Sequence, residues 1–275
     1  MRNRSPMLVT IVAFGYALLY VPIISVIVYS FNDSRLVTLW GGFSLRWYAD
    51  LLSDDELLDA ALLSLRIAIV SATFATALGA IVALALHRVH HLRGRVLLSG
   101  MVTAPLVMPE IITGLSLLFL FISMADLIGW PVSRGASTIT IAHITFSMAY
   151  VVVVVRSRLA AMDESLEEAA MDLGGRPVVV FFDITVPMLL PALVSGWLLS
   201  FTLSLDDLVI SSFVSGPGAT TLPMLIFAKV RLGVTPDINA ITTIIIAVVA
   251  IAVATAAFVS GRRDSDSVQR TASGE

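Results

Sequence analysis

The chain has no cysteine, and charged residues make up only 13% of its 275 residues. Without cysteine there is no disulfide framework, no thiolate metal site and no thiol nucleophile. Soluble domains carry about 25% charged residues, so this composition excludes a soluble globular or a disordered chain. The formal net charge of −3 gives no basic excess that could bind phosphates. We therefore expect no nucleic-acid partner.

Hydrophobic residues are abundant, at 57% of the chain, and they stand in long uninterrupted runs. Transmembrane β-strands alternate apolar and polar residues, so unbroken runs predict helices. Because one crossing needs about 20 apolar residues, the sequence predicts an all-α integral membrane protein with six transmembrane helices in one domain, residues 1–275. The expected spans are 7–31, 60–86, 96–124, 136–155, 187–213 and 238–260, and a disordered polar tail follows at 262–275.

The positive residues are unevenly divided between the two sides of this arrangement. If the N-terminus lies inside, the inner segments hold eleven of the 17 lysines and arginines, and the outer segments hold six. Positive residues favour the cytoplasmic side, so both termini are expected in the cytoplasm. The first span is too long for a typical signal core and no small-x-small cleavage site follows it, so we expect it to be retained.

The inner segment between the fourth and fifth expected spans, residues 156–186, has an amphipathic pattern. Apolar residues recur at three- and four-residue steps from Leu159 to Leu173, which predicts one helix with acidic residues on its other sides. Gly174 and Gly175 are expected to end that helix, and a second short helix is expected at 178–184. An acidic helix is poorly placed on an anionic inner leaflet. A protein partner is therefore favoured over a surface helix resting on the membrane, which the pattern leaves open.

Six residues of this segment stand at the spacing Glu-Ala-Ala-x3-Gly-x9-Ile-x-Leu-Pro, with Val186 at the leucine position. They are Glu168, Ala169, Ala170, Gly174, Ile184 and Pro187. This spacing resembles the EAA loop of ABC importer permeases. In that family the loop forms a helix–turn–helix that sits in a groove of a cytoplasmic ATPase, and the resemblance implies the MetI-like fold of type I importers. It also implies that Glu168, Ala169, Ala170 and Gly174 couple the permease to the ATPase.

The chain lacks the residues needed to supply energy by itself. A Walker A loop requires Gly-Lys-Ser/Thr, whereas the only lysine, Lys229, follows Ala228. No nucleophile stands beside a base, so no catalytic residue is expected and the chain is expected not to be an enzyme. ATP and Mg²⁺ are expected on a separate ATPase subunit, with no cofactor in this chain.

Several other features are expected to be structural. His87, His90 and His91 lie among arginines, which repel a cation, so no metal site is expected. His143, inside the fourth span, is expected to be a hydrogen-bonded packing residue. Small-residue pairs such as Ala75–Gly79 match the helix-packing motif only in part, so they are expected to add little.

Three carboxylates fall inside the expected spans, where ionisable groups are costly and are candidates for function. Glu110 follows two prolines in the third span, and Asp206 and Asp207 lie in the outer half of the fifth. Neighbouring residues on a helix point about 100° apart, so only one aspartate is expected to face a pathway. Arg66 is the only nearby cation in the expected spans, and a single arginine cannot neutralise three carboxylates. A path for a cationic solute is therefore favoured over internal ion pairs.

A further similarity covers four stretches, residues 31–35, 104–118, 201–210 and 212–224. They resemble the polyamine permeases of ABC importers, the putrescine type more than the spermidine type. The resemblance implies a permease subunit of an ATP-driven importer in a bacterial inner membrane, with putrescine as the first candidate substrate. It implies substrate contacts from Glu110 and Asp206, with Asp207 as a third candidate.

The resemblance also implies four partners besides the lipid bilayer. A second, homologous permease would form a heterodimer with this chain, two cytoplasmic ATPase subunits would bind below, and a periplasmic binding protein would deliver the polyamine. Two alternatives remain open. One is a permease for spermidine or another organic cation, and the other, from a different class, is a secondary cation transporter or channel.

Overall fold

The computed structural model describes residues 6–34, 39–89, 94–163, 165–233, 236–248 and 250. It divides into two compact units, one formed by residues 1–55 with 226–275 and the other by residues 56–225. The expected polar tail at 262–275 and most of 249–260, in the sixth expected span, lie outside the described residues. So do His90 and His91.

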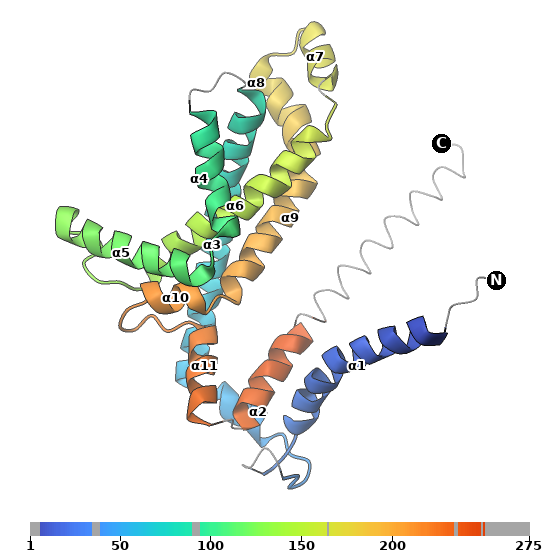
Figure 1. The fold of residues 1–275 in the computed structure, drawn as a ribbon, viewed down its shortest axis with the longest axis vertical. Helices are drawn as coiled ribbons and strands as arrows, with labels where there is room; N and C mark the ends of the chain where they lie inside the picture. The colour runs from blue at the N-terminus through green and yellow to red at the C-terminus, as the bar shows by residue number, and fades with distance from the viewer. Residues whose placement is uncertain are drawn as a thin grey trace. The chain divides into compact units, whose positions relative to one another are not determined.

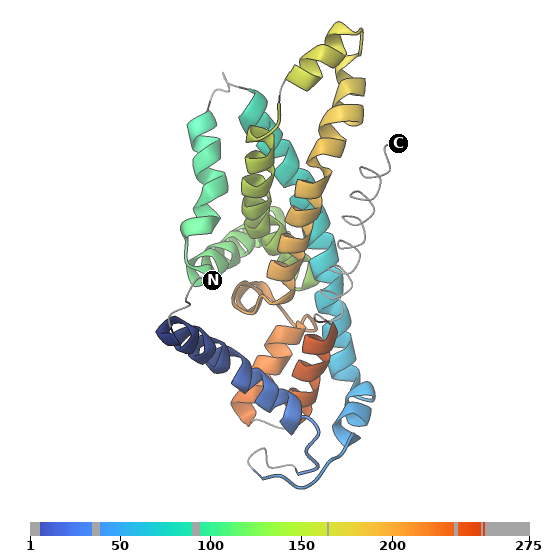
Figure 2. The same ribbon diagram turned by 90° about the vertical axis from the view of Figure 1, so that its right-hand side faces the viewer.

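The unit formed by residues 56–225 contains most of the helices. Figures 1 and 2 show α3, α4, α6 and α9 running along it, with α7 and α8 at one end. Figure 1 shows α5 turning sharply away from α4 and lying beside α10. The elements are α3 (Asp55–Arg88), α4 (Arg95–Val107), α5 (Glu110–Ile128), α6 (Ala136–Ala160), α7 (Ser165–Asp172), α8 (Pro177–Val180), the π-turn η1 (Phe181–Thr185), α9 (Val186–Leu205) and α10 (Val209–Val214).

A stripe of small residues on α3 allows a close approach to α6. A Cβ atom added at Gly79 would lie 2.8 Å from Val151 Cγ1 and 3.2 Å from the carbonyl oxygen of Met148. The expectation that small-residue packing adds little is wrong, because the small side chains let the two helix backbones approach. The alanines of this stripe with 0% exposure are Ala68, Ala72, Ala75 and Ala83.

Two apolar clusters hold this unit together. One joins α3, α5, α6 and α10 and includes Ile67, Phe121 and Phe146. The other joins α3, α4, α6 and α9 and includes Leu86 and Val155. Helices α3 and α6 contribute to both clusters and therefore connect them.

The third expected span is not one helix. Helix α4 ends at Val107, Met108 is extended with ψ 136°, and α5 begins at Glu110. Pro109 explains the break, because proline lacks an N–H group and disfavours the helical conformation of the residue before it. The single helix expected at 96–124 is therefore corrected to two helices, and Glu110 begins the second of them.

The fifth expected span is also interrupted. Helix α9 ends at Leu205 and α10 begins at Val209. Asp206 and Asp207 therefore lie between two helices, whereas the sequence predicted that they lie within one continuous helix at 187–213. Backbone of this kind at membrane depth is tolerated only where protein buries it or where it lines a cavity.

Five described helices are long and apolar enough to cross a membrane, and two shorter apolar helices accompany them. The all-helical class is confirmed for the described residues, whereas the count of six spans stays a prediction. The five are Val9–Tyr29, Asp55–Arg88, Glu110–Ile128, Ala136–Ala160 and Pro177–Leu205, and the shorter two are Arg95–Val107 and Pro236–Val248.

The unit formed by the two chain ends contains α1 (Pro6–Tyr29), α2 (Arg46–Leu52), most of α11 (Leu222–Leu232) and the helix Pro236–Val248. Asn32, with 0% exposure, organises the turn after α1. Its side chain accepts a hydrogen bond from the Gly41 amide at 2.7 Å, and its carbonyl accepts one from the Trp47 indole at 2.7 Å. The ammonium of Lys229 lies 2.9 Å from a carboxylate oxygen of Asp54.

Candidate functional site

The segment expected to couple to an ATPase forms a helical hairpin at one end of its unit (Figure 1). The expectation of one helix from Leu159 to Leu173 is wrong, because Leu159 belongs to α6 and is 3% exposed. Helix α6 continues to Ala160 and buries Leu159 in the cluster around Val155. The separate amphipathic helix, α7, is therefore shorter than the apolar pattern indicated.

A local hydrogen bond fixes the start of α7. The amide of Ser165 donates to a carboxylate oxygen of Asp163 at 3.0 Å. Hydrogen bonds from the Ser165 side chain and then its amide lower the pKa of Asp163 below its ordinary value. A lowered pKa favours the ionised carboxylate, so this capping interaction is present at neutral pH and is lost as the pH falls through that pKa.

The turn at the end of α7 is confirmed where the glycines predicted it. Gly174 has φ +90°, the left-handed conformation that glycine adopts at little cost. The amide of Gly175 donates to the Ala170 carbonyl at 3.0 Å. The short helix expected at 178–184 is instead α8 followed by the π-turn η1, and both run without a break into α9.

The predicted coupling residues lie on an accessible helix. Of the eight residues of α7, all of which the structure describes, none is buried. Glu168, Ala169 and Gly174 are exposed and Ala170 is half-buried. Large apolar side chains are also exposed along the hairpin, and a grouped apolar surface is typical of a protein contact. They are Leu166, Met171, Leu173, Val178 and Val179.

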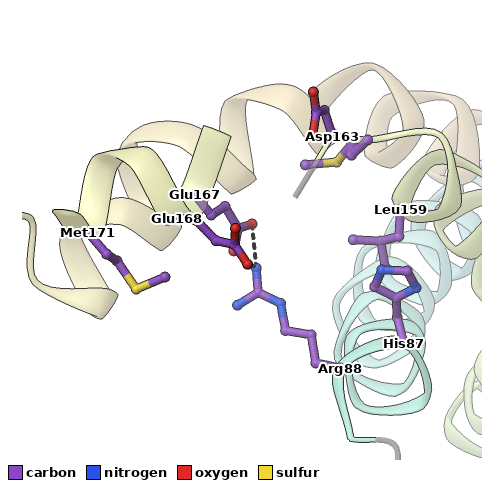
Figure 3. A pocket seen from close by; sticks show the side chains of 8 residues that line it. His87, Arg88, Leu159, Asp163, Glu167, Glu168 and Met171 are labelled. Carbon is purple, nitrogen blue, oxygen red and sulfur yellow. Dashed lines mark hydrogen bonds and ion pairs between the residues drawn. The ribbon is translucent and has the colours of Figure 1, made fainter. Parts of the chain in front are cut away.

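Sequence reasoning missed Glu167 and Arg88, which meet beside this hairpin. Figure 3 shows Arg88 extending from the end of α3 toward Glu167 on α7. The Arg88 Nη2 atom lies 2.6 and 2.7 Å from the two carboxylate oxygens of Glu167. The two residues are 79 positions apart, so no local spacing rule could have paired them. Arg88 and Glu167 line a pocket to which Glu168 and Asp163 also contribute.

Glu110 is the first residue of α5 and Asp206 directly follows the last residue of α9, so both acids lie at helix breaks, and both are exposed. Glu110 is in the first turn of α5, where the helix dipole favours a negative charge. Helices α5 and α10 pack closely, since a Cβ added at Gly114 would lie 3.3 Å from Ile210 Cα. Each acid lies four residues before one of these contact residues, Glu110 before Gly114 within α5 and Asp206 before Ile210 across the break.

Asp207 differs from its neighbour because it is 8% exposed and internally hydrogen-bonded. It accepts hydrogen bonds from the amide and the hydroxyl of Ser211, both at 2.7 Å, and from the amide of Ile210 at 3.2 Å. The ring of His143 lies 3.1 Å from Asp207 and 2.6 Å from the hydroxyl of Ser204. The expected role of His143 as a hydrogen-bonded packing residue is confirmed.

Two parts of this arrangement are suited to binding: the hairpin of α7 and α8, and the acids at the helix breaks. An exposed hairpin suits contact with a partner, and two exposed carboxylates at helix breaks suit contact with a cation. Among the described residues, no group of three or more histidine or acidic side chains could hold a metal ion.

The comparison with protein families identifies the class of protein. Residues 75–263 match the family described as the inner membrane component of binding-protein-dependent transport systems. The chain belongs to this family. It is therefore a subunit of a transport system, in agreement with its several helices that are able to span a membrane.

Individual proteins of known name are also similar to this chain. The putrescine transport system permease protein PotI of Escherichia coli (strain K12) is 58% identical over 248 residues, which cover 90% of this chain and 88% of that protein. The spermidine/putrescine transport system permease protein PotC of Haemophilus influenzae is 46% identical over 231 residues, covering 84% and 87%. The expected membership of the polyamine permease family is confirmed.

Solved structures show the fold. A bacterial ABC transporter involved in import of the acidic polysaccharide alginate has a chain with a TM-score of 0.70 at 17% identity, covering 95% of this chain and 98% of that one. The MetNI methionine ABC transporter has a chain with a TM-score of 0.59 at 16% identity, covering 78% and 95%. The expected MetI-like permease fold is thereby confirmed.

Proposed function

We propose that this chain is a permease subunit of an ATP-driven ABC importer that moves putrescine across a bacterial inner membrane. The family and the similarity to PotI and PotC support the transport of a polyamine. The observation that carries the mechanism is the exposed hairpin of α7 and α8, turned at Gly174. An exposed hairpin of this kind would let an ATPase subunit bind the permease and move it.

The proposed coupling residues suit a docking surface. Ala169 and Ala170 carry the smallest side chains, so a partner surface can approach the α7 backbone closely. Glu168 is exposed and offers a charge-assisted hydrogen bond to a basic group. Gly174 sets the turn that presents the hairpin. Two cytoplasmic ATPase subunits would bind ATP and Mg²⁺ and would contact this chain and a second, homologous permease.

The proposed substrate path runs past the two helix breaks. Broken helices frequently form the substrate sites of transporters, and the carboxylates of Glu110 and Asp206 would hold the ammonium ends of putrescine. Asp207 is committed to hydrogen bonds with Ser211 and Ile210. Its role in the path would therefore be to fix the backbone that presents Asp206.

The cycle follows from this arrangement. ATP binding would close the ATPase dimer and draw the hairpins together, and rigid-body rocking would open the path to the periplasm. A periplasmic binding protein would then deliver the polyamine, and hydrolysis would reset the complex. Both termini and the hairpin would face the cytoplasm, as the distribution of positive residues predicts.

The first experiment tests the substrate and the energy source. The chain is purified with its partner permease, ATPase and binding protein, and uptake of putrescine, spermidine and cadaverine into liposomes is measured with and without ATP. We expect ATP-dependent uptake of putrescine. Spermidine uptake with no putrescine uptake would reassign the substrate, and uptake by this chain alone without ATP would favour a secondary transporter or channel.

The second experiment tests the path. Glu110→Gln and Asp206→Asn should each lower putrescine uptake about tenfold or more. A hydrogen bond to a charged group contributes about 1.5–3 kcal/mol, and 1.4 kcal/mol is a factor of ten. Glu56→Gln, an exposed acid at the start of α3, is the matched control and should retain uptake. Wild-type uptake in both test variants would contradict the cation path.

The third experiment tests the coupling. Glu168→Lys and Gly174→Pro should separate ATP hydrolysis from putrescine uptake while the permease still inserts in the membrane. Glu168→Gln, which keeps the size of the side chain, should have a smaller effect. Unchanged uptake in Glu168→Lys would contradict the coupling role.

A further inference from the structure

We propose that Arg88, Glu167 and Thr185 form a joint through which movement of α7 is transmitted to α3 and α9. Arg88 and Glu167 would then be positioning residues for transport, because they act through the helices and do not touch the substrate. The proposal rests on the proposed function, since it concerns how the coupling hairpin drives the membrane helices. We call these three residues the joint.

The joint is a closed set of short polar contacts (Figure 3). Arg88 Nη2 lies 2.6 and 2.7 Å from the two carboxylate oxygens of Glu167. The Thr185 hydroxyl donates to Glu167 Oε1 at 2.6 Å, and Arg88 Nη2 lies 3.3 Å from that hydroxyl. Each residue of the joint therefore contacts the other two.

The carboxylate of the joint is more shielded than that of an ordinary surface ion pair. The Arg88 side chain is 43% exposed, whereas the Glu167 side chain is 22% exposed and Thr185 has 0% exposure. Exposed pairs contribute little because water and salt screen them. Here the carboxylate also accepts from a buried hydroxyl, and hydrogen bonds to an ionised group are stronger than neutral ones.

The position of the joint gives it a mechanical consequence. Helix α7, described throughout, has no buried residue of its own, so apolar packing alone cannot fix it to the unit. Its Glu167 reaches Arg88, the last residue of the 34-residue helix α3. Glu167 also reaches Thr185, the last residue of η1, which leads directly into α9. A displacement of α7 would therefore pull on two helices at once.

The backbone beside the joint has an unusual form. Residues Phe181–Thr185 form a π-turn, and π-turns inside α-helices are rare and frequently mark functional sites. The guanidinium of Arg88 also lies 5.7 Å from the centroid of the Phe181 ring, within the distance of a cation–π contact. Arg88 is thus held both by the carboxylate of Glu167 and by the first residue of the π-turn.

Charge reversal tests the joint in the complete complex. Arg88→Glu and Glu167→Arg are each measured for putrescine uptake per ATP hydrolysed in liposomes, together with the variant that carries both changes. Substitutions at contacting residues are coupled, and a fivefold change corresponds to about 1 kcal/mol, since 1.4 kcal/mol is a factor of ten. We expect each single reversal to lower the ratio about fivefold or more and the paired reversal to restore most of it.

Asp172 provides the matched control, because it also lies on α7 but is exposed and outside the joint. The combination of Arg88→Glu with Asp172→Arg should restore nothing. Two outcomes overturn the proposal. One is a wild-type ratio in either single reversal, and the other is a loss that the paired reversal of Arg88 and Glu167 leaves unrepaired.

Charge reversal could prevent assembly, which co-purification of the ATPase subunits would reveal. In that case Arg88→Gln, Glu167→Gln and the double variant replace the reversals. The joint predicts that the second change adds little to the loss caused by the first, whereas fully additive losses overturn it. Failure of the proposed function is distinguishable, because the unmodified complex would then show no ATP-dependent putrescine uptake.

Discussion

The substitution Gly79→Ala tests the close approach of α3 and α6. The added Cβ would lie 2.8 and 2.9 Å from two atoms of Val151 and 3.2 Å from the Met148 carbonyl oxygen, whereas ordinary contacts begin at 3.4 Å. Val151 is β-branched and has one preferred rotamer in a helix, and the carbonyl oxygen is fixed by the backbone. The helices must therefore move apart by several tenths of an ångström.

The expected cost follows from two opposing contributions. Overpacking of a filled core costs about 1–3 kcal/mol, and replacing glycine by alanine in a helix returns about 1 kcal/mol. Because the clash at Gly79 involves rigid groups, we expect a net loss of about 1–2 kcal/mol in the free energy of unfolding. Equilibrium unfolding of the purified chain from detergent micelles, followed by circular dichroism in increasing dodecyl sulfate, measures it.

Gly100→Ala is the matched control, because a Cβ added there meets nothing within 4 Å in the described structure. That variant should be as stable as the parent or more stable by up to about 1 kcal/mol. Adding Val151→Ala to Gly79→Ala should relieve the clash and recover part of the loss. Equal stability of Gly79→Ala and Gly100→Ala would refute the close-packing argument.

Three further changes test other contacts. His143→Ala removes the ring beside the buried Asp207 and should cost about 1–2 kcal/mol in the same unfolding assay; a stability equal to the parent would contradict the role of this cluster. Gly174→Ala places a Cβ at φ +90°, which costs about 1–2 kcal/mol, and should speed amide hydrogen exchange in α7 and α8; unchanged exchange would argue against strain at the turn. Lys229→Gln removes the partly exposed contact with Asp54 and should change stability by less than about 1 kcal/mol, so a larger loss would indicate that this pair is more strongly shielded than its exposure suggests.

Local chemistry predicted the parts of the fold that depend on neighbouring residues. The apolar runs predicted helices because a backbone in a bilayer must satisfy its own hydrogen bonds. Gly174 predicted the turn after α7 because its backbone conformation is one that glycine adopts readily. Pro109 is also a local cause, because it disfavours a helical residue before it, although one helix was expected at 96–124 and the structure separates α4 from α5 there.

Contacts between distant segments were not predictable in the same way. The apolar steps from Leu159 to Leu173 suggested one helix, since Leu159 has the same character whether it faces a partner or the core. Packing assigned Leu159 to α6 and left α7 without buried residues. The small residues around Gly79 were read as incomplete motifs because Val151, which fits against them, lies on another helix.

The amino-acid sequence by itself determined that this is a helical membrane subunit with a glycine turn after an amphipathic helix and with too few positive groups in its spans to neutralise their acids. Apolar run lengths, glycine positions and charge counts are properties of the chain, and they required no partner contacts. Only the tertiary structure decided that Asp206 is exposed while Asp207 is buried beside His143, and that Glu167 pairs with Arg88. The reason is physical: adjacent acidic residues have the same intrinsic chemistry, and the side chains that distant helices bring beside each one set its role.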